Sequence, residues 1–387
     1  MAYPYSKQTI TNEDVQKVSK VLKSKLITQG PVVKKFEKSI ANFVGAKYAS
    51  ATNSATSALH VSCLALDLKK GDYVWTVPNS FVASANCAVY CGAKVDFVDI
   101  DENDLNIDIE KLETKLKLKK KLPKILISVH FAGQPTKQSQ IWKLAKKYRF
   151  HVIEDASHSL GAKNKGNYVG SCRWSDISVF SFHPVKTITA GEGGVATTNN
   201  LNLYKRVELF KNHGISRDRK NLLKKKLDFW YYEQHLLGFN YRMSELSAAL
   251  GLNQIKYIKK FVAMRNKCAK IYGNLLKNLG VRFQKIHKDN YSSYHLFIIV
   301  LEKRFKKKYN NIFKNLRKLG VMVNLHYLPI HLQPFYKKFG FKNGDFPISE
   351  DYASRALSIP IYPGLKIKDQ TKIKNILEKI LLKNSKF

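Results

Sequence analysis

The sequence predicts an α/β protein with two domains: a large domain around a mostly parallel, seven-stranded sheet, and a smaller C-terminal α+β domain. In the first two-thirds of the chain, short apolar segments alternate with stretches of helical length, which is typical of a parallel sheet with helices on both faces. A chain of 387 residues can also form two sizeable cores. We therefore expect a large domain over residues 1–250 and a small one over 251–387, joined by a long helical region near 243–279.

The individual elements follow from the apolar runs and the turn residues between them. Strands are expected at 48–51, 73–77, 94–98, 125–129, 150–154, 177–182 and 195–198. Helices are expected between them at 55–66, 84–90, 109–116 and 139–148. In the C-terminal part, strands are expected at 295–300 and 321–324, and helices at 310–319 and 370–382.

The composition is that of an ordinary globular protein rather than a disordered or membrane protein. Hydrophobic residues make up 44% of the chain, which excludes general disorder. No run approaches the roughly twenty apolar residues that a membrane helix needs, and residues 1–6 do not resemble a secretion signal. The five cysteines have no Cys-x-x-Cys spacing, so buried thiols are favoured over a metal or disulfide site. We expect a cytoplasmic protein with no metal and no membrane partner.

The net charge of +38 has two interpretations. Nucleic-acid-binding proteins carry such an excess because Lys and Arg neutralise phosphates. Here the lysines are spread through segments such as 116–124, 223–227 and 304–308, and no nucleic-acid-binding motif accompanies them. We favour solvated lysine faces, which would still attract an anionic small substrate.

A lysine and an aspartate form the centre of the candidate site. Lys186 lies on a connection, expected to be short and stiff, between the strands at 177–182 and 195–198, beside Gly191, Gly193 and Gly194. An amine held there can act as a covalent nucleophile toward carbonyls. Asp155 follows the strand at 150–154, at the sheet edge where ligands bind in open α/β folds. Pyridoxal 5′-phosphate requires these two groups, a Schiff-base amine and an anion opposite its ring nitrogen.

Hydroxyl groups at the start of a helix allow two functions. Asn53, Ser54, Thr56 and Ser57 surround the first turn of the apolar helix at 55–66, where small polar residues act as caps. The same free N–H groups, with the Thr56 hydroxyl, can bind a phosphate at the positive end of the helix dipole. Beside Lys186 and Asp155 we favour the phosphate site, which Ser181 could complete.

Two other residues have both a structural and a functional interpretation. His158 could be a packed histidine or could support Asp155 or contact the cofactor ring oxygen. Phe81 could be a core residue or could stack on the cofactor ring. Local sequence alone assigns Arg242 to an exposed loop, and it assigns no role to the basic segment 217–226.

Ordered motifs along nearly the whole chain resemble those of one family. They lie at 26–31, 36–37, 53–59, 154–158, 181–194, 240–252, 326–334 and 358–364. At these positions the chain resembles the DegT/StrS group of sugar-nucleotide aminotransferases, which have the fold-type I architecture of pyridoxal-phosphate enzymes. Segments 182–189 and 53–59 are most similar to the pseudaminic-acid-pathway enzymes, the UDP-4-amino-4,6-dideoxy-N-acetyl-beta-L-altrosamine transaminases. Some members of the group lack the lysine, so the presence of Lys186 indicates transamination.

The resemblance implies a role for each matching position. Lys186 would be joined to pyridoxal 5′-phosphate and Asp155 would bind its ring nitrogen. The remaining cofactor contacts would be Ala55, Thr56 and Ser181 at the phosphate, Phe81 on the ring face, His158 as a support, and Asn240 at the phosphate of the other subunit's cofactor. The residues bordering the sugar nucleotide would be Tyr5, Leu26, Ile27, Thr28, Gln29, Asn324, Leu325, His326 and Tyr327.

The implied reaction is a transfer of an amino group from L-glutamate to the C4 ketone of a UDP-linked 4-keto-6-deoxy-N-acetyl hexose. The implied assembly is a homodimer with active sites at the subunit interface. Two alternatives stay open: amination of another sugar nucleotide, such as a dTDP-sugar at C3 or C4, and a regulatory or nucleic-acid-binding protein on the same scaffold.

Overall fold

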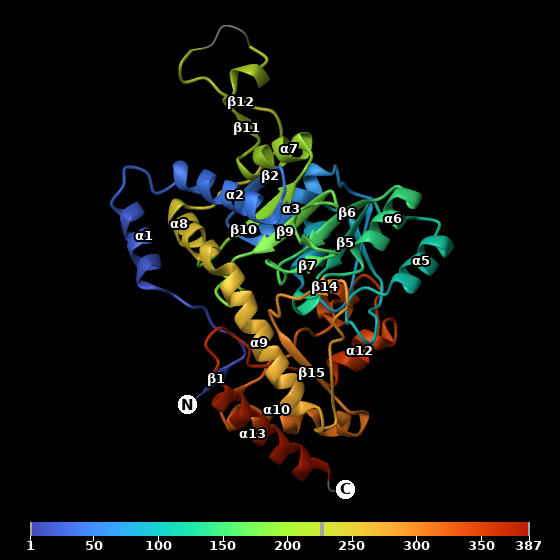
Figure 1. Ribbon diagram of the computed structural model, residues 1–387. Coiled ribbons are helices and arrows are strands. Elements are labelled where there is room, and N and C mark those ends of the chain that lie inside the picture. Colours follow the sequence, from blue (N-terminus) through green and yellow to red (C-terminus); the bar gives the residue numbers. More distant parts are fainter. Residues whose placement is uncertain (1, 225–227, 386–387) are drawn as a thin grey trace.

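A computed structural model describes residues 2–224 and 228–385, and it contains the seven-stranded sheet that the sequence predicts (Figure 1). The strands, in spatial order, are β2 (Tyr48–Thr52), β10 (Gly194–Thr198), β9 (Ile177–Ser181), β6 (His151–Asp155), β5 (Ile125–Val129), β3 (Tyr73–Thr76) and β4 (Lys94–Phe97). Only β10 runs antiparallel to its neighbours in this sheet. Each predicted strand of this sheet is confirmed to within one residue at either end, whereas the strand predicted at 295–300 begins two residues later.

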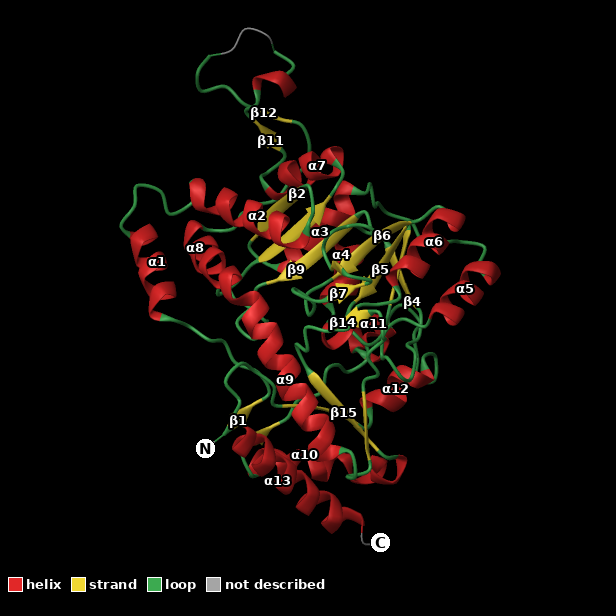
Figure 2. Cartoon of the chain, in the orientation of Figure 1, coloured by secondary structure: helices red, strands yellow, loops and turns green. Residues whose placement is uncertain are grey.

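Helices cover both faces of the sheet (Figure 2). The expected ones are α3 (Ala55–Ala65), α4 (Ala83–Tyr90), α5 (Ile109–Leu118) and α6 (Gln138–Tyr148), and three further helices are α1 (Asn12–Leu22), α2 (Pro31–Val44) and α7 (Leu201–Lys211). Alternate residues of one strand enter different cores: Ile125 and Ile127 pack with α3 and α4, whereas Leu126 packs with α5 and α6. Burial on both faces explains the continuously apolar strands.

The helical region between the two domains is not one uninterrupted helix. It consists of α8 (Glu245–Gln254), a 3₁₀ turn η3 (Ile255–Tyr257) and α9 (Ile258–Leu276). The Ser244 side chain accepts a hydrogen bond from the Ser247 backbone N–H, so α8 begins later than the predicted residue 243. The domain boundary near residue 250 remains a prediction.

The C-terminal part forms a smaller α+β unit with its own core. Its antiparallel sheet contains β13 (Val281–Phe283), β15 (Phe297–Leu301) and β17 (Ala356–Ile359). The helices of this part of the chain are α10 (Tyr309–Lys318), α11 (Pro334–Lys337), α12 (Pro347–Ala353) and α13 (Ile367–Ser385). The strand predicted at 321–324 is shorter, as β16 (Val321–Met322), and it pairs in parallel with β1 (Tyr3–Pro4). Residues near the N-terminus therefore pack on the C-terminal unit.

Five short strands in two small sheets complete this description of the fold. Strands β7 (Lys163–Asn164), β8 (Asn167–Tyr168) and β14 (Asn290–Tyr291) form a small sheet, and β11 (Ile215–Ser216) pairs with β12 (Glu233–Gln234). Strands β11 and β12 lie above α7 at the top of Figure 1. Within the described ranges, no helix combines the length and apolar character needed to cross a membrane.

Candidate active site

Lys186 lies on the connection between β9 and β10, as predicted, but this connection is longer than the short loop that we expected. It runs from Phe182 to Gly193, and its base is closed by a hydrogen bond from the Phe182 N–H to the Gly193 carbonyl (2.9 Å). The Ala190 N–H donates back to the Phe182 carbonyl (2.9 Å). These bonds return the loop to the sheet edge, which explains how a long connection can still hold a lysine in place.

Asp155 ends β6 and is fixed by two donors. The Ser84 hydroxyl donates to one carboxylate oxygen (2.6 Å) and the Ser157 backbone N–H donates to the other (3.1 Å). The side chain is 6% exposed. A carboxylate with both oxygens bound in this way is held in one orientation.

One cavity of about 740 Å³ brings together most of the predicted site residues. Its lining includes Lys186, Asp155, His158, Phe81, Ser181, Ala55, Thr56, Tyr5, Asn324, Leu325, His326 and Tyr327. These residues come from the ends of several strands, the start of α3, the N-terminal segment and the C-terminal unit. The sequence prediction that they form one site is consistent with this geometry.

The start of α3 combines a helix cap with an open anion site. Ser54 is the cap, because its hydroxyl oxygen accepts from the Ser57 N–H (3.1 Å). Thr56 is left on the cavity wall. A Cβ added to Gly194 would lie 2.3 Å from the Ser54 carbonyl oxygen and 2.5 Å from the Ala55 nitrogen. Only glycine lets β10 approach the first turn of α3 so closely, and the first turn faces the cavity with its positive dipole end.

The surroundings of Lys186 lower the pKa of its amine. Burial lowers its pKa to about 8, and the Asp155 carboxylate acts in the opposite direction. An amine with this pKa is partly unprotonated near neutral pH, and the unprotonated form is the one that attacks a carbonyl. Nucleophilic lysines are activated by desolvation in the same manner.

His158 is a neutral donor in this site. Burial lowers its pKa well below the ordinary range, and the charges of Lys186 and His326 act in the same direction. Its Nδ1 accepts from the Ala132 backbone N–H (3.3 Å), so Nε2 carries the proton and donates to the Tyr327 hydroxyl (3.1 Å). Tyr327 in turn can donate its own proton to an acceptor in the cavity.

Five predicted site residues do not line this cavity. Leu26, Ile27, Thr28 and Gln29 lie on the loop between α1 and α2, and Asn240 lies on the segment before α8. The Asn53 N–H donates to the Tyr241 carbonyl (2.8 Å), so the chain around Asn240 runs beside the phosphate loop without entering the cavity. Within one chain, the structure therefore does not bring these residues to Lys186.

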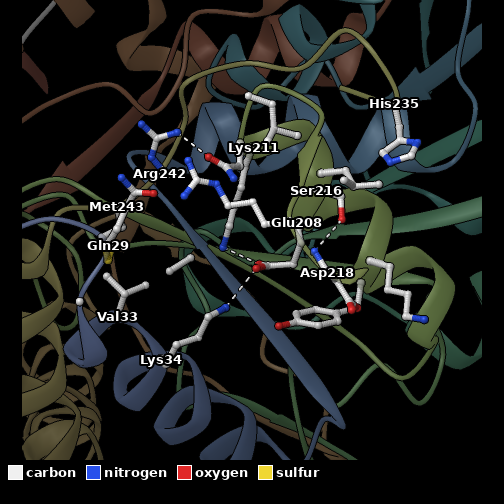
Figure 3. A pocket seen from close by; sticks show the side chains of 18 residues that line it. Gln29, Val33, Lys34, Glu208, Lys211, Ser216, Asp218, His235, Arg242 and Met243 are labelled. Carbon is white, nitrogen blue, oxygen red and sulfur yellow. Dashed lines mark hydrogen bonds and ion pairs between the residues drawn. The ribbon is translucent and has the colours of Figure 1, made fainter. Parts of the chain in front are cut away.

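Gln29 lines a second cavity of about 810 Å³, which also contains Arg242 (Figure 3). Lys34, Glu208 and Lys211 point toward one another on its wall, and the two ammonium groups lie 3.0 and 2.5 Å from the Glu208 carboxylate. Although burial opposes ionisation, Lys211 and Lys34 hold the pKa of Glu208 at about 2. The basic charge of this wall is therefore partly neutralised.

Sequence reasoning missed the role of Ser84 beneath Asp155. Ser84 lies in the predicted helix 84–90, where a small hydroxyl residue gives no specific signal. The two side chains are 71 positions apart, and they meet only because α4 packs beside β3 and β6 follows in the sheet.

In the described ranges, no group of three or more His, Cys, Asp or Glu side chains could hold a metal ion.

This fold and this site define a pyridoxal-phosphate-dependent aminotransferase. The chain belongs to the DegT/DnrJ/EryC1/StrS aminotransferase family, whose model matches residues 8–378. It is a sugar-nucleotide aminotransferase of that family. The lysine, the strand-end carboxylate and the open helix start are the donor set that the cofactor requires, so the residues present fit it.

Two relatives and two solved structures place the chain within the family. It is 38% identical to the UDP-4-amino-4,6-dideoxy-N-acetyl-beta-L-altrosamine transaminase of Campylobacter jejuni, over 99% of this chain and 98% of that one. It is 32% identical to the GDP-perosamine synthase of Escherichia coli O157:H7, over 94% of each chain. The Helicobacter pylori PseC structure, an aminotransferase of pseudoaminic acid biosynthesis, matches with a TM-score of 0.90, 31% identity and coverage of 99% and 100%. The PLP form of a putative sugar aminotransferase from Streptococcus pneumoniae matches with a TM-score of 0.91, 25% identity and the same coverage.

Proposed function

We propose that this protein transfers the amino group of L-glutamate to the C4 ketone of a UDP-linked 4-keto-6-deoxy-N-acetyl hexose, in a pathway of the pseudaminic acid type. The observation that carries the proposal is that Lys186, Asp155 and the start of α3 all line the same cavity. The similarity to the Campylobacter and Helicobacter enzymes supports this choice of sugar.

The amine of Lys186 holds the cofactor and moves the proton. Pyridoxal phosphate, when bound, supplies the electron withdrawal that makes a Cα–H bond of the donor acidic. Lys186 would take the proton from that Cα as a general base and would deliver it to the C4′ carbon of the cofactor as a general acid. Its pKa of about 8 places both protonation states within reach near neutral pH.

The other cavity residues bind and orient. Asp155, held by Ser84 and Ser157, keeps a negative charge toward the cofactor's ring nitrogen. Thr56, Ser181 and the N–H groups at Ala55 hold the phosphate, with the dipole of α3 behind them. Phe81 is 56% exposed, and in the proposal it covers the ring face.

The substrate side of the cavity is proposed to be Tyr5 with the segment from Asn324 to Tyr327. His158 donates to Tyr327, and Tyr327 donates onward to an oxygen of the cofactor or the sugar. Burial raises the pKa of Tyr327, with Asp155 and Tyr5 acting in the same direction, so the hydroxyl stays protonated at any working pH.

We further propose a homodimer, because Asn240 and Leu26–Gln29 can contribute to catalysis only from outside their own chain's cavity. Asn240 is exposed, as a residue that reaches into a partner must be. Location in the cytoplasm and absence of nucleic-acid binding stay predictions. The second prediction is checked by measuring DNA binding at physiological salt. Non-specific binding through scattered surface lysines should be lost under that condition.

Absorbance spectroscopy tests the chemistry. Wild-type protein with pyridoxal phosphate should develop visible absorbance that L-glutamate bleaches, whereas Lys186→Ala should show neither the attached-cofactor band nor turnover. Borohydride reduction followed by peptide mapping should place the cofactor on Lys186. Normal turnover by Lys186→Ala would disprove the assignment.

A second candidate substrate is a GDP-linked 4-keto-6-deoxy hexose, which the similarity to GDP-perosamine synthase favours. The glutamate-treated enzyme should be offered the UDP-linked N-acetylated ketone and the GDP-linked ketone in turn. Return of the visible band with the UDP sugar alone supports the proposal. Return with the GDP sugar alone replaces it with the second candidate.

A further inference from the structure

Arg265 on α9 is a fully buried cation whose hydrogen-bond partners are neutral. It is 0% exposed. One terminal nitrogen, Nη1, donates to the backbone carbonyls of Tyr294 (3.3 Å), His295 (3.1 Å) and Ile361 (2.9 Å). In the described part of the chain, no carboxylate lies within ion-pairing distance of it. Burying a charge without a counter-charge is costly, so a compensating function is expected.

The other terminal nitrogen points toward the lysine loop. Nη2 donates to the hydroxyl of Ser6 (3.3 Å), and that hydroxyl donates to the carbonyl of Val185 (2.9 Å). Arginine has no acceptor, so the Ser6 oxygen must accept from it and the Ser6 proton must go to Val185. The chain of bonds therefore ends one residue before Lys186.

The same guanidinium holds the segment that carries Ser6. The Ile361 N–H donates to the Tyr5 carbonyl (3.0 Å), and Arg265 binds the carbonyl of Ile361 itself. Tyr5 lies on the wall of the active cavity. Arg265 thus connects the C-terminal unit, the N-terminal segment and the lysine loop at a single point.

We propose that Ser6 and Arg265 are positioning residues for the transamination. They hold the Val185 carbonyl, and with it the backbone direction of Lys186, in a geometry that depends on the C-terminal unit being docked. A charge-bound hydroxyl donates more strongly than an isolated one, which makes Ser6 a firmer anchor for Val185 than a serine alone. This inference rests on the proposed role of Lys186 as the attachment and proton-transfer residue.

The test is Ser6→Ala, which removes the hydroxyl with little change of volume. Because misplacing a catalytic group by about 1 Å can cost up to roughly a hundredfold in rate, we expect kcat for the glutamate half-reaction to fall about ten- to a hundredfold. KM for glutamate should change by less than about twofold, because the bond is made to the enzyme and not to the substrate. Gln8→Ala, at an exposed position two residues away, is the matched control and should behave like wild type.

A second readout does not depend on the loaded enzyme. In the cofactor-free protein, amide hydrogen exchange of residues 183–187 should be faster in Ser6→Ala than in wild type or Gln8→Ala, while exchange in β6 and β9 is unchanged. Replacing Arg265 is not used, because it would leave three buried carbonyls unpaired and could unfold the protein.

The outcomes separate this inference from the proposed function. A Ser6→Ala enzyme with wild-type kcat, or with wild-type exchange at 183–187, overturns the positioning role while the lysine chemistry stands. If peptide mapping finds the cofactor on a residue other than Lys186, the proposed function and this inference both fail.

Discussion

Replacement of Lys186 by methionine should stabilise the cofactor-free protein near neutral pH. Methionine has similar length and no charge, so the substitution removes the half-buried ammonium while largely keeping the packing. Burial lowers the pKa of Lys186 from its ordinary value of 10.5 to about 8. At about 1.4 kcal/mol per pKa unit, this corresponds to a penalty of about 3 kcal/mol, an upper bound because the side chain borders a cavity.

The sign of the pH dependence follows from the lower pKa in the folded state. Below pH 8 the amine is protonated in both states, so the whole penalty is present. Between pH 8 and 10.5 the unfolded chain binds more protons than the folded one, so the wild-type protein gains stability as pH rises. Above 10.5 both forms are neutral and the penalty has disappeared.

The assay is urea unfolding of the cofactor-free proteins at pH 7 and at pH 10. Lys186→Met should unfold at higher urea than wild type at pH 7, and the difference should shrink at pH 10. Lys38→Met, at an exposed position, provides the control for general charge removal. If Lys186→Met is no more stable than Lys38→Met at pH 7, or if the gap grows at pH 10, then Lys186 is not desolvated and the basis for its reactivity is wrong.

Three further predictions concern Asp155, Glu208 and the dimer. Ser84→Ala should weaken cofactor binding about tenfold or more, because it removes a hydrogen bond to the Asp155 carboxylate. Equilibrium titration of the absorbance measures the cofactor affinity, and an unchanged affinity would contradict the prediction. Glu208→Gln should lower the free energy of unfolding at pH 7 by up to about 3 kcal/mol, because the pKa of Glu208 is about 2 in the folded protein and 4.5 in the unfolded chain. The difference between variant and wild type should vanish as the pH falls from 4.5 to 2, and urea titrations measure it. Lys186→Ala and Asn240→Ala should each be inactive alone, and mixing them should restore about a quarter of wild-type activity after subunit exchange, since one site in each mixed dimer is then intact. No recovery would mean that Asn240 acts within its own chain, and full activity of Asn240→Ala alone would mean that Asn240 has no role.

The strands were predictable because each is a short apolar run between turn residues, and burial on both faces makes that signal strong. Helices α1 and α2 were not predicted, although α1 carried a detectable signal. Thr11 and Asp14 form a capping box, in which each side chain accepts from the other's backbone N–H. The pattern Thr-x-x-Asp at the start of an amphipathic helix could have located its beginning.

The centre of the site was predictable from local context, and its supports were not. Lys186 and Asp155 stand out because each follows a strand at the same edge of the sheet. Ser84 and Ser6 reach them from distant parts of the chain, and a lone serine gives no signal of its own. For Asn240 and Gln29, a motif indicates participation in a site but not which subunit's site it is, because that depends on the assembly.

Pairing of β1 with β16 sets an order on the protein's biosynthesis. Tyr3 pairs with Val321 and the Tyr5 carbonyl accepts from the Ile361 N–H, so Tyr3 and Tyr5 lack these partners until more than 300 later residues have been made. At about 5–20 residues per second, the segment waits roughly 20–70 s on the ribosome. The large domain can close its sheet during that time, with Lys186 already on its loop. Tyr5 can join the cavity wall only afterwards, so a nascent chain cannot hold its completed active site before the C-terminal unit has emerged.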